Sequence, residues 1–120
     1  MSVRVYLPTT RAGLASLVAG EDWASVQQRS GDLVVAEGDS EDEEYAALMT
    51  AADASTALVV AAEEPGLRRV VVVAEVDGSG SPVVLGDVVA VHLDTEDRAV
   101  DADPDDDLAW FAPEELGHLA

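Results

Sequence analysis

The sequence has no cysteine, lysine, isoleucine or asparagine, and it contains one phenylalanine and only two histidines. Without cysteine the chain has no disulfide framework, no thiolate nucleophile and no cysteine-ligated zinc or iron–sulfur site. With only His92 and His118 available, a Ser-His-Asp catalytic arrangement has few ways to form. No apolar run is long enough to span a membrane, and the opening MSVRVYLP is typical of a strand rather than of a targeting leader. These absences predict a soluble, cytoplasmic protein and favour a non-catalytic role over an enzyme.

Acidic residues dominate the charge of the chain. Its 120 residues include 25 aspartates and glutamates against six arginines, which gives a formal net charge of −19. Hydrophobic residues still make up 48%, too many for an intrinsically disordered chain. We therefore expect one folded domain over residues 1–120. The charge makes nucleic acid and membranes poor direct partners and favours a basic protein surface. Composition does not predict an oligomeric state.

The apolar patterns predict a small α/β sandwich. Residues 3–7 are typical of a strand that ends at Pro8, and the helix that follows is capped by Thr9 or Thr10 and ends at Gly20. WASVQQ and DLVVAE are weak strand candidates. Residues 41–64 form a long helix with Tyr45, Leu48, Met49, Ala52, Thr56 and Val59 at helical spacing, and Pro65-Gly66 stops it.

The second half of the chain contains the strands expected at the centre of the sheet. Residues 68–76 and 88–93 are apolar enough to be covered on both faces. A short helix capped by Thr95, an extended LAWF segment and a helix from Pro113 complete the pattern. The order is β-α-β-α-β-β-α with a short C-terminal helix, for which we expect a mostly parallel or mixed sheet.

The most conspicuous segment, EGDSEDEE, places six acids within Glu37–Glu44. Ser40 and Glu43 have the spacing of a capping box, and carboxylates in a first helical turn each contribute about 0.3–1 kcal/mol through the helix dipole. Capping uses only two or three acids. The surplus suggests that the cluster binds a basic partner surface or a cation, and a solvated helix start is the alternative. The candidate partner-binding residues are Glu37, Asp39, Glu41, Asp42 and Glu44.

Several segments carry a family resemblance. VRVYLPTT, EGDSEDEEYAALMTAADAS, RRVVVVAEV, VVAVHLD and DDDLAWFAPEELGHL occur in order over most of the chain. Together they resemble a family of small acidic actinobacterial proteins known only as a domain of unknown function. The segment between Gly20 and Glu37 departs from that pattern. The resemblance implies a GC-rich genome, which also fits the missing residue types, and it implies no activity.

A metal site is the first chemical hypothesis. If the chain stays extended after residue 93, then His92, Asp94 and Glu96 point to one face with Asp97 beside them, and a divalent metal accepts such ligands. The structural alternative is that His92 ends a buried strand and Asp94 helps to cap the next helix. No other cofactor is expected.

A cleft at the strand ends is the second chemical hypothesis. In open parallel sheets, ligands bind beyond the carboxyl ends of strands, so Thr9, Thr10 and Arg11 could hold an anion while His92 and Asp94 act as acid and base or bind a metal. Neither GxGxxG nor GxxxxGK[ST] occurs in the chain.

Two pairs of neighbouring residues complete the candidates. Arg68-Arg69 is expected to neutralise Glu63 and Glu64. Trp110 and Phe111 are expected to face opposite sides of a strand, one in the core and the other exposed as a contact anchor.

Three functions fit the sequence. The first is a non-catalytic accessory or regulatory protein that docks by its acidic surface onto a basic protein. The second is a small metal- or nucleotide-dependent enzyme that uses the strand-end cleft. The third is a nucleic-acid mimic, which needs carboxylates spaced like phosphates on one face. We favour the first.

Overall fold

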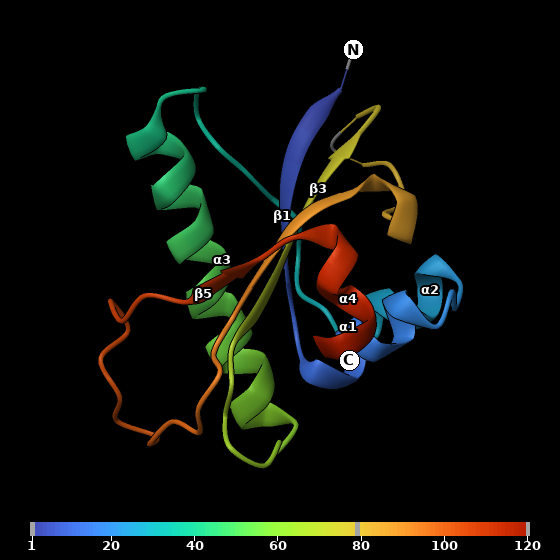
Figure 1. Cartoon of the computed structure of the whole chain (residues 1–120). Coiled ribbons are helices and arrows are strands. Elements are labelled where there is room, and N and C mark those ends of the chain that lie inside the picture. The colour runs from blue at the N-terminus through green and yellow to red at the C-terminus, as the bar shows by residue number, and fades with distance from the viewer. Residues whose placement is uncertain (1, 79, 120) are drawn as a thin grey trace.

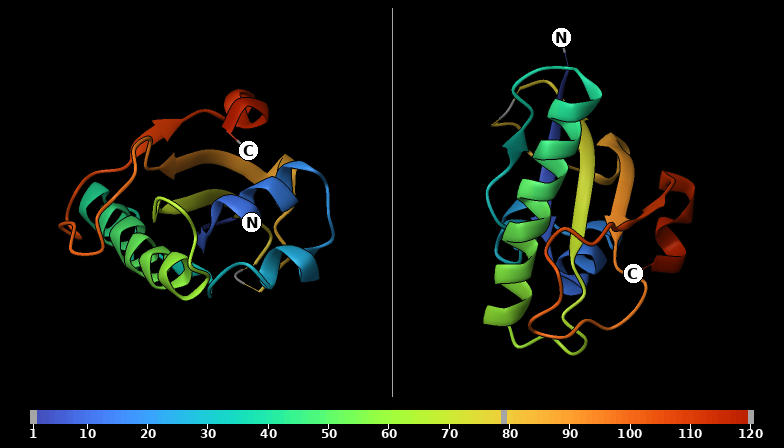
Figure 2. Two further views of the ribbon diagram at one scale, coloured as in Figure 1. Left: turned by 90° about the horizontal axis from the view of Figure 1, so that it is seen from below. Right: turned by 90° about the vertical axis from the view of Figure 1, so that its left-hand side faces the viewer.

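The computed structural model describes residues 2–78 and 80–119, which form three layers. A five-stranded sheet lies between α3 on one face and α1, α2 and α4 on the other (Figures 1 and 2). The elements, in chain order, are β1 (Val3–Thr9), α1 (Arg11–Val18), α2 (Trp23–Gln27), β2 (Val34–Val35), α3 (Glu41–Ala61), β3 (Val70–Val76), β4 (Val88–Leu93), β5 (Ala109–Phe111) and α4 (Leu116–Leu119). Short 3₁₀ turns precede β4 at Leu85–Asp87 and α4 at Pro113–Glu115.

The sheet has the order β2-β1-β3-β4-β5, and each hydrogen-bonded pair is antiparallel. The α/β class is confirmed, but the prediction of a mostly parallel or mixed sheet was wrong. Both β2 and β3 are antiparallel to β1, so they run in the same direction and α3 connects them. Because β1 lies between these two strands, the parallel pair does not share hydrogen bonds.

The two Val-rich strands lie inside the sheet, as predicted. Along β3 the side chains alternate between the two faces. Val71 and Val73 pack against the alanines of α3, whereas Val70 and Val72 pack against Leu14 and the other apolar residues on the side of α1 and α4. Both faces of β3 are therefore buried.

Helix α3 begins at Glu41 with Ser40 as its cap, as predicted, but ends at Ala61 rather than Glu64. The turn that follows contains three left-handed residues, Glu63, Gly66 and Leu67. The buried face of α3 is formed by small residues, namely Ala47, Ala51, Ala52, Ser55 and Val59, while Tyr45 is exposed. Within the described ranges no helix, α3 included, is long and apolar enough to cross a membrane.

Three local predictions were wrong. The first is that WASVQQ forms a strand. The segment forms the helix α2 instead, which Asp22 caps and whose Val26 is buried in the core. The second is the helix after Thr95, because the segment between β4 and β5 is irregular. The third is the end of β1, which continues through Pro8 to Thr9. Proline is tolerated there because β2 pairs only with Val5 and Tyr6, and the Pro8 carbonyl accepts from the Gly31 amide at 2.9 Å.

Candidate functional site

The candidate site lies at the end of the sheet where β3 begins and β4 ends. Val70 on β3 is opposite Leu93 on β4. The antiparallel register therefore places Arg69, one residue before β3, beside Asp94, one residue after β4. The Asp94 amide donates to the Arg69 carbonyl at 3.1 Å, which extends the ladder by one residue pair.

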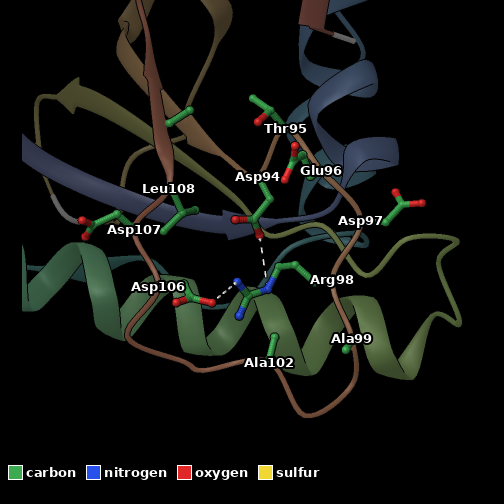
Figure 3. A pocket seen from close by; sticks show the side chains of 11 residues that line it. Asp94, Thr95, Glu96, Asp97, Arg98, Ala99, Ala102, Asp106, Asp107 and Leu108 are labelled. Atoms are coloured by element: carbon green, nitrogen blue, oxygen red, sulfur yellow. Dashed lines mark hydrogen bonds and ion pairs between the residues drawn. The ribbon is translucent and has the colours of Figure 1, made fainter.

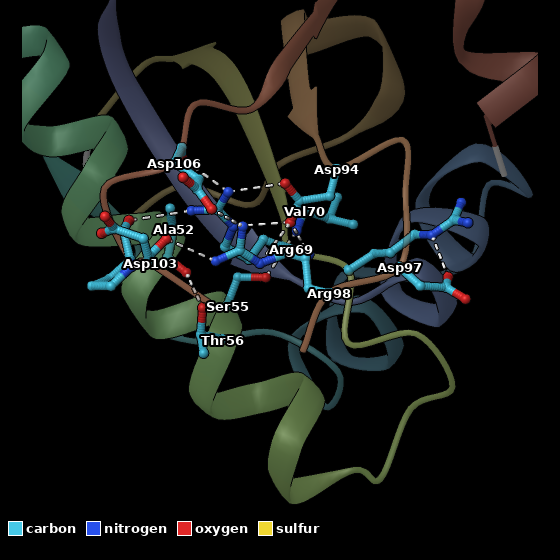
Figure 4. A network of polar contacts seen from close by, with 12 residues as sticks. Ala52, Ser55, Thr56, Arg69, Val70, Asp94, Asp97, Arg98, Asp103 and Asp106 are labelled. Atoms are coloured by element: carbon cyan, nitrogen blue, oxygen red, sulfur yellow. Dashed lines mark hydrogen bonds and ion pairs between the residues drawn. The ribbon is translucent and has the colours of Figure 1, made fainter. Parts of the chain in front are cut away.

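Arg69 and Asp94 form a buried, bidentate ion pair (Figure 4). The Arg69 Nε and Nη2 atoms donate to the two carboxylate oxygens of Asp94, each at 2.9 Å, and the Arg69 amide donates to Oδ2 at 2.8 Å. The Arg69 side chain has 0% of its surface exposed and the Asp94 side chain 8%. In this geometry each charged group is hydrogen-bonded to the other. Burying either charge alone would be strongly unfavourable.

The same arginine holds the irregular segment of residues 94–108, which we name the acidic loop. Arg69 donates through Nη1 to the Pro104 carbonyl at 3.3 Å and through Nη2 to the Asp106 carbonyl at 2.9 Å. Arg98, within the loop, donates to the Asp103 carbonyl at 3.1 Å and lies 3.6 Å from Asp94 Oδ2. Two arginines on its inner side therefore fix the backbone of the acidic loop.

The acidic loop encloses a hollow of about 520 Å³ (Figure 3). Five of its lining residues are acidic and one is an arginine: Asp94, Glu96, Asp97, Asp106, Asp107 and Arg98. Since Asp94 is already paired with Arg69, the remaining carboxylates give the hollow a negative lining. Such a hollow fits a cationic group better than an anionic one.

The structure does not bring His92, Asp94, Glu96 and Asp97 together as metal ligands. His92 is opposite Val71 and Trp110, which places its half-buried ring on the α3 side of the sheet, and burial lowers the pKa of the imidazole. Asp94 is taken by Arg69, and Asp97 accepts from Arg68 Nε at 2.9 Å. Across residues 2–78 and 80–119, no group of three or more histidine or carboxylate side chains is placed to hold a metal ion.

Thr9 and Thr10 serve the fold rather than a cleft. Both are buried, at 1% and 4% exposure. The Thr9 hydroxyl donates to the Arg29 carbonyl at 3.0 Å, and the Thr10 hydroxyl caps α1 by accepting from the Gly13 amide at 3.0 Å. Of the three predicted residues only Arg11, the first residue of α1, is exposed.

The acid cluster at the start of α3 combines a helix cap with uncompensated charge. The Ser40 hydroxyl accepts from the Glu43 amide at 3.2 Å, as expected, but the Glu43 carboxylate accepts from that hydroxyl at 2.8 Å instead of from the cap amide. Glu44 pairs with Arg4 at 3.1 Å. The other predicted partner-binding residues are exposed, and none has an ion pair among the described residues: Glu37, Asp39, Glu41 and Asp42.

A contact between Tyr45 and Asp107 connects this cluster to the acidic loop. The Tyr45 hydroxyl donates to Asp107 Oδ1 at 3.1 Å, and this hydrogen bond raises the pKa of the tyrosine. Figures 1 and 2 show the acidic loop beside α3. We name the combined surface the acidic face. It comprises Glu37, Asp39, Glu41, Asp42 and Glu44 together with Glu96, Asp97, Asp101, Asp103, Asp105, Asp106 and Asp107.

The expected neutralisation of Glu63 and Glu64 by Arg68-Arg69 was wrong, because both arginines pair with residues after β4. The two side chains leave the chain on opposite faces, Arg69 towards α3 and Arg68 towards α1. One signal in the sequence could have indicated the buried pair. Arg69 directly precedes one buried strand and Asp94 directly follows the next, so an antiparallel pairing makes them neighbours.

Comparison with known proteins identifies a family but no individual curated protein or solved structure. No curated protein matches the chain, and no solved structure matches it either. A family model matches residues 3–120, nearly the whole chain. The protein therefore belongs to DUF6912, a family of unknown function.

Proposed function

We propose that this protein is a non-catalytic accessory or regulatory protein that docks through its acidic face onto a basic surface of a protein partner. The observation that supports this most strongly is that Arg69 and Arg98 hold the acidic loop in one shape from its inner side. Carboxylates on a backbone that is already fixed lose little further conformational entropy on binding, which favours affinity.

The charge of the acidic face exceeds what the fold uses. Among the described residues, arginines reach only Glu44, Asp97 and Asp106 on this face. Exposed ion pairs of this kind contribute at most about 1 kcal/mol each, and the remaining like charges repel one another. A basic partner would relieve that repulsion and would be steered to the face over long range.

An exposed aromatic residue lies on the same side of the sheet. Trp110, on the edge strand β5, is 60% exposed and is opposite His92, so it faces the α3 side as the acidic face does. Tryptophans are enriched among the residues that dominate binding energy at protein interfaces. The expected contact anchor is therefore Trp110, while Phe111 faces the opposite side.

A capture experiment tests the proposal. The immobilised protein is incubated with lysate of its native organism, and bound proteins are identified by mass spectrometry. The test variant, Asp39→Asn/Glu41→Gln/Asp42→Asn, keeps Ser40 and Glu43 for the helix cap. The matched control, Asp32→Asn/Glu63→Gln/Asp77→Asn, removes three exposed charges that lie outside the acidic face.

We expect the wild type and the control to retain a protein with a basic surface that the test variant loses. Capture should also fall steeply as salt rises through about 0.1 M, where exposed charges are screened beyond about 10 Å. If the test variant and high salt both leave capture unchanged, docking through the acidic face is wrong.

A further inference from the structure

A second pocket, which shares Asp94 and Thr95 with the acidic hollow, lies on the side of the sheet that α1 and α4 cover. It has a volume of about 230 Å³. Its polar lining comes from α1, the residue before Arg69, the end of β4 and α4: Arg11, Arg68, Asp94, Thr95 and His118. Since Arg69 already pairs with the Asp94 carboxylate, the side chains left to act on a ligand are two arginines, a histidine and a threonine.

Arg11 is unusual among the arginines of this protein. Within residues 2–78 and 80–119, five of the six arginines lie within 4.0 Å of at least one carboxylate, and Arg11 is the exception. Arg11 is also the first residue of α1, where a cation opposes the helix dipole.

Arg68 adds a second cation to the same pocket. Its Nε atom is paired with Asp97, and 28% of the Arg68 side chain is exposed. The side chains of Arg11, Arg68 and His118 therefore line one pocket in a protein that is otherwise strongly acidic. Two guanidinium groups that line one small pocket favour an anionic ligand there.

The rest of the pocket is apolar. Its wall is formed by Val70, Leu93, Phe111 and Leu119. The volume is below the roughly 300–1,000 Å³ that is typical of pockets for drug-sized ligands. A ligand that fits has one oxyanion group for the guanidinium groups and a short apolar body for the wall.

We propose that this pocket binds a small organic anion, a carboxylate or a phosphate monoester attached to a short apolar group. Arg11 and Arg68 donate to the oxyanion, which guanidinium groups bind through paired hydrogen bonds. Phe111 and Leu119 contact the apolar part. The proposal does not rest on docking by the acidic face, because none of the acids at the start of α3 lines this pocket.

Titration of the purified protein with three ring compounds tests the pocket. Benzoate and phenyl phosphate present the two oxyanions on the same apolar body, and benzamide is the neutral control. Binding is followed by chemical shifts of the backbone amides in ¹H–¹⁵N spectra. We expect saturable shifts at Arg68, Phe111 and Leu119 for at least one of the anions, with no saturable shift for benzamide. The anion that binds more tightly identifies the ligand class.

A pair of variants with the same change in charge makes the test specific. Arg11→Gln should weaken binding about tenfold or more, as expected for the loss of charge-assisted hydrogen bonds. Arg4→Gln, at an exposed position of β1 outside the pocket, should leave the Kd within about twofold of wild type. Absence of saturable binding by both anions, equal binding of benzamide, or equal weakening by the two variants would overturn the proposal.

Discussion

At the scale of single residues, the Arg69–Asp94 pair determines the shape of a long irregular loop. Removing two charges from water costs several kcal/mol for each, so such a pair is a weak source of net stability. Its geometry nevertheless leaves little freedom, because each carboxylate oxygen and the guanidinium group have partners in the sheet or in the acidic loop. The pair therefore specifies one conformation of the loop.

The first prediction concerns one half of this pair. Asp94→Asn leaves the Arg69 charge buried without a full counter-charge, and we expect the free energy of unfolding to fall by about 3–5 kcal/mol in urea titrations. Asp97→Asn breaks the neighbouring Arg68 pair, in which the aspartate is 73% exposed, and should cost at most about 0.5 kcal/mol. Equal losses in both variants would contradict the burial argument. Hydrogen exchange should also become faster in the acidic loop of the Asp94 variant only.

The second prediction concerns the pH dependence that His92 contributes. Burial lowers the pKa of His92 below its ordinary value of 6.5, so the unfolded chain takes up this proton at a higher pH than the folded chain. Stability should therefore fall as the pH drops below about 6.5, and this contribution should level off below the folded-state pKa.

His92→Gln removes this contribution, which isolates it from the general effect of protonating carboxylates. Thermal unfolding between about pH 7.5 and pH 5.5 should show a smaller loss of Tm in this variant than in the wild type. His118→Gln, at an exposed position of α4, is the matched control. A pH profile of His92→Gln that is identical to that of the wild type would contradict the prediction.

At the scale of elements, α3 is fixed to the sheet by small residues and one hydroxyl. Ala51 and Ala52 are fully buried, so the helix axis lies close to the strands. The Ser55 hydroxyl donates to the Thr9 carbonyl at 2.7 Å and accepts from the Val70 amide at 2.9 Å. One side chain thus joins α3 to the end of β1 and the start of β3.

The third prediction follows from this bridge. Ser55→Ala leaves a buried amide and a buried carbonyl without their partner, and we expect a loss of about 1–3 kcal/mol of unfolding free energy. Thr56→Ala is the neighbouring control, because the Thr56 hydroxyl donates only to the Ala52 carbonyl of its own helix. Circular dichroism during urea unfolding measures both. The bridging role would be wrong if the Thr56 variant lost as much stability as the Ser55 variant.

The strands show what the sequence can predict. Val70–Val76 and Val88–Leu93 are apolar on both faces, and a strand with two apolar faces has to lie inside a covered sheet. The strand order does not follow from that pattern, because β1 lies between β2 and β3, which are consecutive in the chain. Topology of this kind arises from contacts distant in sequence.

The helices show where local patterns fail. Helix α3 is apolar around much of its surface, so helical spacing did not distinguish the exposed Tyr45 from the buried alanine face. Helix α2 is five residues long and contains too few turns for a period to be recognised. Asp94 was singled out from the sequence as a metal ligand or an acid–base group rather than as the partner of Arg69, and the role of Arg69 depends on strand pairing.

At the scale of the whole molecule, the negative net charge has two opposing effects. A net charge of −19 favours binding to basic surfaces and also destabilises the compact state through self-repulsion. The acidic face concentrates this repulsion, because the start of α3 and the acidic loop meet at Tyr45 and Asp107. A helix cap alone does not require such a density of carboxylates.

The last prediction separates the two effects with one reagent. Added sodium chloride screens exposed charges, so the Tm of the wild type should rise with salt up to about 0.5 M while capture of a basic partner declines. At low salt, Asp39→Asn/Glu41→Gln/Asp42→Asn should have a Tm equal to or above that of the wild type and should gain less from salt. The control Asp32→Asn/Glu63→Gln/Asp77→Asn should keep more of the salt response, because its charges are dispersed over the molecule. Differential scanning fluorimetry measures these shifts. A lower Tm in the acidic-face variant would show that the dipole and cap gain exceeds the repulsion, and the cluster would then be explained as a helix start alone.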